Sequence, residues 1–136
     1  MKVLITGGAG FIGSNVAKYF LDRHHHVVVL DNLTTGCREN IPKSPKLEFI
    51  EGDILNQKDL RKSIQDCSVA LHLAASVGNI RSLEHSQKDS EINILGTLNL
   101  LEAAREKGVQ KVVYSSSAGI FGELKQLPIE EDHPTA

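Results

Sequence analysis

The sequence opens with a short apolar run that leads directly into a cluster of glycines. Val3, Leu4 and Ile5 form the run, which is typical of a strand buried on both faces. A helical pattern begins immediately after the glycines. Glycine lets the backbone turn sharply and approach a ligand, and the free N–H groups at a helix start attract anions. The order of strand, glycine turn and helix therefore predicts a phosphate-binding site. The cluster comprises Gly7, Gly8, Gly10 and Gly13.

The glycine spacing narrows this prediction to a dinucleotide. Gly8-x-Gly10-x-x-Gly13 fits the general dinucleotide fingerprint, and Thr6-Gly7-x-x-Gly10-x-x-Gly13 fits a narrower one. Glycine-rich turns also serve as plain connections, so the spacing alone is weak evidence for a binding site. The strand before the turn and the helix after it favour binding of a pyrophosphate.

An acidic residue follows the second apolar run. Residues 27–30 read as a buried strand that ends at Asp31, eighteen positions after Gly13. A carboxylate at about this spacing accepts hydrogen bonds from the adenosine ribose and repels a 2′-phosphate. No arginine immediately follows Asp31, which favours NAD over NADP. The alternative is that Asp31 only caps the turn.

Apolar periodicity predicts the remaining elements. Residues 47–50, 68–73 and 111–115 are expected to be strands. Three helices are expected. The first carries Ile12, Val16 and Phe20 on one side, and the second begins after an Asn56 cap. The third runs from Ser90 to Lys107 and ends at Gly108. Five strands with helical or long connections predict an α/β fold, a Rossmann-like doubly wound parallel sheet in the order 3-2-1-4-5.

Composition limits the function classes. The 136 residues are expected to form one domain, residues 1–136, and their net charge of −2 without a basic run disfavours nucleic-acid binding. No apolar run has the length of a membrane span. Cys37 and Cys67 are expected to be free thiols of a cytoplasmic protein. The three histidines at 24–26 are expected in a solvated turn rather than at a metal, and His72 in the core rather than as a base.

Several motifs in order resemble the extended short-chain dehydrogenase/reductase family, and within it the NAD-dependent nucleotide-sugar epimerases and dehydratases, the 4-epimerases above all. The resemblance spans essentially the whole chain. Its motifs are Thr6-Gly-Gly-Ala-Gly-Phe-Ile-Gly13, Asp31-Asn32-Leu33, Gly52-Asp53-Ile54, His72-Leu-Ala-Ala75, Asn93-Ile-Leu-Gly-Thr-Leu-Asn-Leu-Leu-Glu-Ala-Ala104 and Val113-Tyr-Ser-Ser-Ser-Ala118.

The resemblance implies a role for each part of these motifs. Phe11 and Ile12 would offer backbone groups to the pyrophosphate, residues 31–36 would hold the adenosine ribose and its phosphate, and residues 53–54 the adenine. Residues 73–77 would line the nicotinamide ribose above Asn93. Ser117 is the implied catalytic residue, bonding the sugar 4-oxygen. The implied cofactor-binding residues are Gly7, Gly10, Phe11, Ile12, Gly13, Asp31, Asn32, Leu33, Thr34, Thr35, Gly36, Asp53, Ile54, Leu73, Ala74, Ala75, Ser76, Val77 and Asn93.

The general base of the family, a tyrosine in a Tyr-x-x-x-Lys pair, is missing from this sequence. Arg23 stands four residues after Tyr19, and Ala118 four residues after Tyr114. Core packing is expected to explain both tyrosines. The family's sixth strand and carboxyl-terminal substrate lobe would lie beyond the last residue. The first hypothesis is therefore the NAD-binding part of a nucleotide-sugar 4-epimerase that is not catalytically complete.

Two alternatives stay open. One is a naturally short, non-catalytic dinucleotide-binding module. The other is part of a related nucleotide-sugar dehydratase or decarboxylase. Because the helix from Ser90 to Lys107 would carry an uncovered apolar face, self-association is expected under each reading. Whether the chain is an enzyme is left open.

Overall fold

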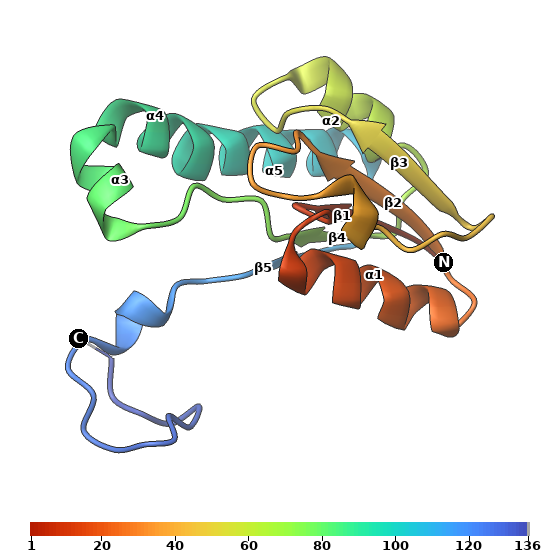
Figure 1. Ribbon diagram of the computed structural model, residues 1–136. Helices are drawn as coiled ribbons and strands as arrows, with labels where there is room; N and C mark the ends of the chain where they lie inside the picture. Colours follow the sequence, from red (N-terminus) through yellow and green to blue (C-terminus); the bar gives the residue numbers. More distant parts are fainter. Residues whose placement is uncertain (136) are drawn as a thin grey trace.

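Five parallel strands form one sheet in the order β3-β2-β1-β4-β5 (Figure 1). The computed structural model describes residues 1–135. Ile5 at the centre of the sheet lies beside Val29 on one side and Leu71 on the other. The predicted fold class and strand order are confirmed. The strands are β1 (Lys2–Thr6), β2 (His26–Asp31), β3 (Leu47–Glu51), β4 (Val69–His72) and β5 (Lys111–Tyr114).

Helices cover both faces of the sheet (Figure 1). Helix α1 packs on one face, and α2 and α5 pack on the other. A π-helical segment, Glu91–Leu95, joins α4 to α5. None of the helices formed by residues 1–135 is long and apolar enough to span a membrane. The helices are α1 (Phe11–Asp22), α2 (Gln57–Ser63), α3 (Asn79–Glu84), α4 (Ser86–Ser90) and α5 (Gly96–Lys107), with 3₁₀ turns at Arg38–Asn40 and Ala118–Phe121.

The core has two layers because successive strand residues point to opposite faces. Leu4 of β1 packs with Leu60 of α2 and Leu100 of α5. Its neighbour Ile5 packs on the other side with Ala17 of α1. All five side chains are fully buried, and burial of a large aliphatic side chain is worth about 1.5–3 kcal/mol. Packing in these two layers fixes the parallel strands so that their carboxyl ends lie together at one edge of the sheet.

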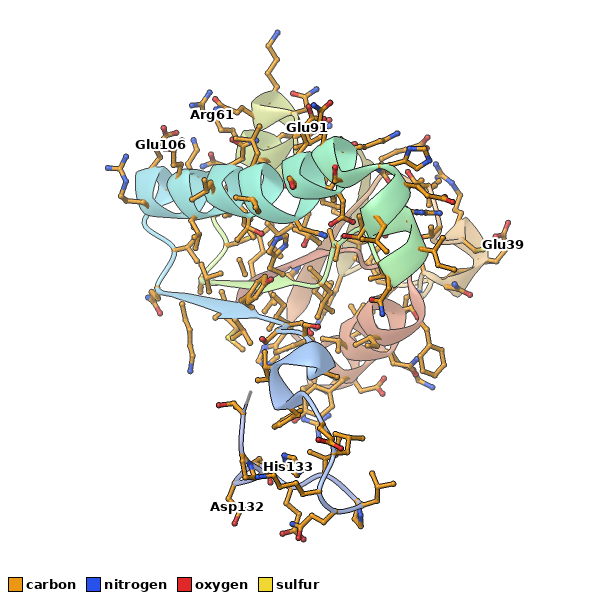
Figure 2. The ribbon with its side chains drawn as sticks, turned by 90° about the vertical axis from the view of Figure 1, so that its left-hand side faces the viewer. Glu39, Arg61, Glu91, Glu106, Asp132 and His133 are labelled. Carbon is orange, nitrogen blue, oxygen red and sulfur yellow. The ribbon has the colours of Figure 1, made fainter. Side chains whose placement is uncertain are left out.

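The predicted helix ends are confirmed. The Asn56 side chain accepts a hydrogen bond from the Lys58 amide and caps α2. Helix α5 ends at Gly108, whose φ of 70° is left-handed. Arg61 of α2 and Glu106 of α5 form an ion pair at 3.0 Å on the molecular surface (Figure 2). Its exposure makes it a minor contribution to stability.

The helix predicted from Ser90 begins earlier than expected. The chain is helical in short pieces from Asn79, and the π-helical segment interrupts it before α5. None of the residues in α3 or α4 is buried. The only apolar residues of α3, Ile80 and Leu83, are exposed, so no buried stripe marks this helix.

Three side chains expected in the core lie at the surface instead. Ile12 is 60% exposed, so Val16 and Phe20 carry the apolar side of α1 without it. Tyr19 is 52% exposed and lies under the Arg23 guanidinium, 3.5 Å from the ring centre. Tyr114 is 58% exposed and lies on β5, an edge strand of the sheet formed by the described residues.

The chain after β5 leads away from the sheet (Figure 1). His133 is buried in this segment and organises it (Figure 2). Its Nε2 accepts a hydrogen bond from the Lys125 amide at 3.1 Å, and its ring meets Phe121 edge-on. The segment thus folds on itself rather than on the sheet.

Candidate functional site

The residues predicted to bind a cofactor gather at one edge of the sheet. They follow the carboxyl ends of β1, β2, β3 and β4 in the segments 7–13, 31–36, 53–54 and 73–77. Ligands of open parallel sheets bind at this edge, where the chain connections diverge to opposite faces. Here that point lies between β1 and β4. Asn93 comes from the π-helical segment, and Ser117 follows β5.

The glycine turn after β1 is pressed against the chain that follows β4. Gly7 has a φ of 70°, and a Cβ there would lie 2.7 Å from the Ala74 nitrogen and 2.8 Å from the Leu73 carbonyl carbon. At Gly13 a Cβ would collide with the Gly7 oxygen. Glycine is therefore required at both positions.

The start of α1 offers backbone donors to an anion. No side chain caps this helix, which begins after Gly10. The Gly10 amide bonds to the Gly7 oxygen, so the turn closes before the helix starts. Phe11 is 84% exposed, so its backbone amide rather than its side chain is the group that can contact a ligand in the crevice. The first-turn amides and the helix dipole suit a pyrophosphate.

Asp31 lies beside this turn and is 8% exposed. Its Oδ2 accepts the Ala9 amide at 2.9 Å, and its Oδ1 accepts the Leu33 amide at 2.8 Å. Asp31 therefore does cap the turn, as the alternative interpretation proposed. A carboxylate has about four lone-pair sites, so it keeps acceptor capacity for ribose hydroxyls. The capping holds the carboxylate in place for that role.

The segments after β2 and β3 are joined to each other. Asn32 Nδ2 donates to Asp53 Oδ2 at 2.9 Å, and Asp53 Oδ1 accepts the Leu55 amide at 2.8 Å. The Thr34 amide and hydroxyl both donate to the Asn32 side chain. Ile54 is buried with its side chain against Gly96. Because its side chain is buried, Ile54 could contact an adenine only through its backbone.

The segment after β4 is held from below by Asn93. Asn93 Oδ1 accepts the Ser76 amide at 2.8 Å, and its Nδ2 donates to the Ser76 carbonyl at 3.0 Å. The oxygen and the nitrogen of the Asn93 side chain therefore both bond to the backbone of Ser76. The structure shows Asn93 supporting residues 73–77, and its role at a cofactor stays a prediction.

Two threonines that lie within the quoted motifs, but for which the sequence predicted no role of their own, flank His72 beneath this segment. Thr6 Oγ1 lies 2.7 Å from His72 Nδ1, and Thr97 Oγ1 lies 3.0 Å from His72 Nε2. Burial lowers the pKa of His72, so the ring is neutral near pH 7. The expected core histidine is confirmed. A hydroxyl inside the apolar run of β1, immediately before the glycines, was the available signal for Thr6.

Ser117 lies outside this cluster. It is exposed, and its Oγ accepts the Gly119 amide at 3.1 Å at the start of a 3₁₀ turn. The chain reaches it past Ser115, whose amide bonds to the His72 carbonyl. A role for Ser117 on a substrate stays a prediction.

The sheet, the glycine turn and the carboxylate after β2 define a Rossmann-type nucleotide-binding domain. Sequence comparison identifies its kind, because the profile of the NAD dependent epimerase/dehydratase family matches residues 3–136. The chain belongs to that family.

Individual relatives carry epimerase names. A UDP-glucose 4-epimerase of Streptomyces lividans is 41% identical over 98% of this chain and 41% of its own length. A CDP-paratose 2-epimerase of Salmonella typhi is 39% identical over 96% of this chain and 41% of its own length. The solved UDP-glucose 4-epimerase of Thermus thermophilus in complex with NAD superposes with a TM-score of 0.88. It is 41% identical over 100% of this chain and 44% of its own. The chain thus spans less than half the length of these relatives.

Proposed function

We propose that residues 7–13, 31–36, 53–54 and 73–77 hold NAD, and that the chain is the cofactor-binding part of a nucleotide-sugar 4-epimerase of the UDP-glucose 4-epimerase kind. The observation that carries the proposal is the uncapped start of α1 beside the buried Asp31 carboxylate. One offers donors for a pyrophosphate, and the other offers acceptors for ribose hydroxyls.

The residues present fit the cofactor but supply only part of a reaction. Bound NAD would take a hydride from the sugar C4 and return it to the other face. The glycine turn would bind and orient the pyrophosphate, and residues 73–77 would shield the nicotinamide end from water. The sequence contains no Tyr-x-x-x-Lys pair to move the substrate proton. A general base is worth about 10²–10⁴-fold, so these residues bind and position rather than turn over substrate.

Calorimetric titration with NAD and NADP tests the binding step. The chain should bind NAD at millimolar or lower concentration and prefer it to NADP. Asp31→Ser should lower NAD affinity by about tenfold or more, since hydrogen bonds to a charged acceptor are worth about 1.5–3 kcal/mol. Asp66→Asn is the matched control, because Asp66 lies before β4 at the opposite edge of the sheet. Absence of NAD binding at millimolar concentration would contradict the proposal.

The reaction could also be that of another family member. The relative named as a CDP-paratose 2-epimerase is nearly as similar as the 4-epimerases. A non-catalytic module is the second alternative. Reading the gene past codon 136 separates the enzyme readings from the module: an in-frame continuation with Tyr-x-x-x-Lys supports an enzyme, and a stop codon supports the module.

We also infer that a second copy of the chain covers the exposed side of the helix formed by the π-helical segment and α5. Ile94, Leu98 and Leu101 are all exposed, and their spacing places them on one helical face. Leu95 lies beside them in a shallow open groove with Ser86 and Gln87. Light scattering should show a dimer that Leu98→Glu dissociates and Glu123→Gln does not. A monomer across a wide concentration range would contradict this.

We further propose that the protein acts in a reducing compartment, the cytoplasm. Cys37 and Cys67 are both free thiols in the structure. Disulfides are rare where glutathione and thioredoxin keep thiols reduced.

A further inference from the structure

A chain of polar groups crosses the apolar core beneath residues 73–77. It joins Thr6 of β1, His72 of β4, Thr97 of α5 and Asn93 of the π-helical segment. We propose that this chain is a one-way hydrogen-bond relay that fixes the 73–77 segment over the crevice, with His72 as its positioning residue in the Nε2–H tautomer. The proposal deepens the NAD-binding function and rests on it.

The direction follows from counting protons. Thr97 Oγ1 donates its single proton to the Asn93 carbonyl at 2.7 Å. Toward His72 Nε2, at 3.0 Å, it can therefore only accept. Nε2 must carry the proton, which leaves Nδ1 of the neutral ring as an acceptor.

The other end of the relay follows from the same count. Because His72 Nδ1 is an acceptor, Thr6 Oγ1 donates to it across 2.7 Å. The two lone pairs of Thr6 Oγ1 then receive the Leu73 amide at 3.3 Å and the Ala74 amide at 3.2 Å. The Leu73 amide is shared with the Thr6 backbone carbonyl at 3.2 Å. In the opposite tautomer Nδ1–H would donate to Thr6 Oγ1, and the Oγ1 proton would lack an acceptor, because the other partners of Oγ1 are backbone amides. Thr6 is fully buried, so water could not compensate.

Both ends of the relay act on the same segment. Thr6 receives the backbone at residues 73 and 74, where the segment leaves β4. Asn93 receives the relay on its backbone carbonyl and holds Ser76 with its side chain. The segment is thus fixed at its start by Thr6 of β1 and at its middle by Asn93 of the π-helical segment. The imidazole is the bridge between them.

A matched pair of variants at Thr97 separates the hydroxyl from its shape. Thr97→Val removes the hydroxyl at nearly constant volume, and Thr97→Ser retains it. Amide hydrogen exchange at Ser76 should accelerate about tenfold in Thr97→Val and less than about twofold in Thr97→Ser. The amide of Val28 in the core should exchange as in the wild type, which verifies that the variants are folded. Equal protection of Ser76 in Thr97→Val and the wild type would overturn the proposal.

The tautomer of His72 can be measured in the wild-type chain, without a variant. A role of the ring in packing alone would not determine which nitrogen carries the proton. Nitrogen-15 NMR of the wild-type chain should show a protonated Nε2 and an unprotonated Nδ1 on His72. A protonated Nδ1 would overturn the relay even if Thr97→Val failed to fold. His72→Gln, which can place an N–H near Nε2, should protect Ser76 better than His72→Met, which has similar length and no donor.

Titrations with NAD and ADP connect the relay to the cofactor. ADP carries the half assigned to the glycine turn and Asp31, whereas NAD also reaches residues 73–77. Thr97→Val should therefore lower NAD affinity about fivefold and change ADP affinity less than about twofold. Equal losses for both ligands would refute action through the segment. If the wild type binds no NAD, the proposed function fails, while the tautomer and the Ser76 exchange still decide the relay.

Discussion

Replacement of Gly7 by alanine tests whether the glycine turn is constrained by its close approach to the chain after β4. A left-handed residue other than glycine costs about 1–2 kcal/mol. The new Cβ would also lie 2.7 Å from the Ala74 nitrogen, far inside van der Waals contact. Overpacking of this kind costs about 1–3 kcal/mol. Gly7→Ala should therefore lower the free energy of unfolding by about 2–5 kcal/mol.

Gly108 provides the matched control. It has the same φ of 70°, and a Cβ built there meets nothing within 4 Å. Gly108→Ala should cost only the backbone part, about 1–2 kcal/mol. Urea denaturation followed by circular dichroism gives both values, and similar m-values would show that the same surface unfolds. If the two variants lose stability equally, within about 0.5 kcal/mol, the close approach is not a constraint.

Two further predictions follow from buried titratable groups. Burial lowers the pKa of His72 below its usual 6.5. The unfolded state therefore binds more protons below about pH 6.5, and stability falls with decreasing pH by at most about 1.4 kcal/mol per unit. His72→Gln should flatten this part of the pH profile of unfolding; an unchanged profile would contradict the assignment. Burial raises the pKa of Cys67 to about 11, so a thiol reagent should label the exposed Cys37 in the folded chain and reach Cys67 only on unfolding. Equal labelling rates would show that the core opens there.

The elements that the sequence predicted are those whose pattern is set by burial on known sides. The strands were visible because a central parallel strand is apolar on both faces, as at residues 27–30. Asn56 and Gly108 marked helix ends because their chemistry is local to the backbone they cap. The helical or long connections between the strands predicted a parallel sheet and its strand order. That order in turn predicted the position of the crevice between β1 and β4.

What the sequence could not show depends on contacts distant along the chain. Thr6 and Thr97 are separated by 91 positions, and only the fold brings them to opposite sides of one imidazole. Helix α3 was missed because its apolar residues, Ile80 and Leu83, are exposed and mark no buried side. The exposure of Tyr114 depends on which elements pack over the face of β5, and no local pattern encodes this.

The π-helical segment makes chain length, as well as residue identity, matter at this site. A π turn contains one residue more than an α turn, and each residue of an α-helix advances the face by about 100°. Deleting one residue from Glu91–Leu95 would replace the π turn with an α turn and leave α4 and α5 on nearly their present faces, because the π turn already accommodates the extra residue. Asn93 lies inside this turn, so the deletion would change its position relative to Ser76. Insertions and deletions in this family should therefore be excluded from this segment and tolerated in the exposed stretch 78–85 before it.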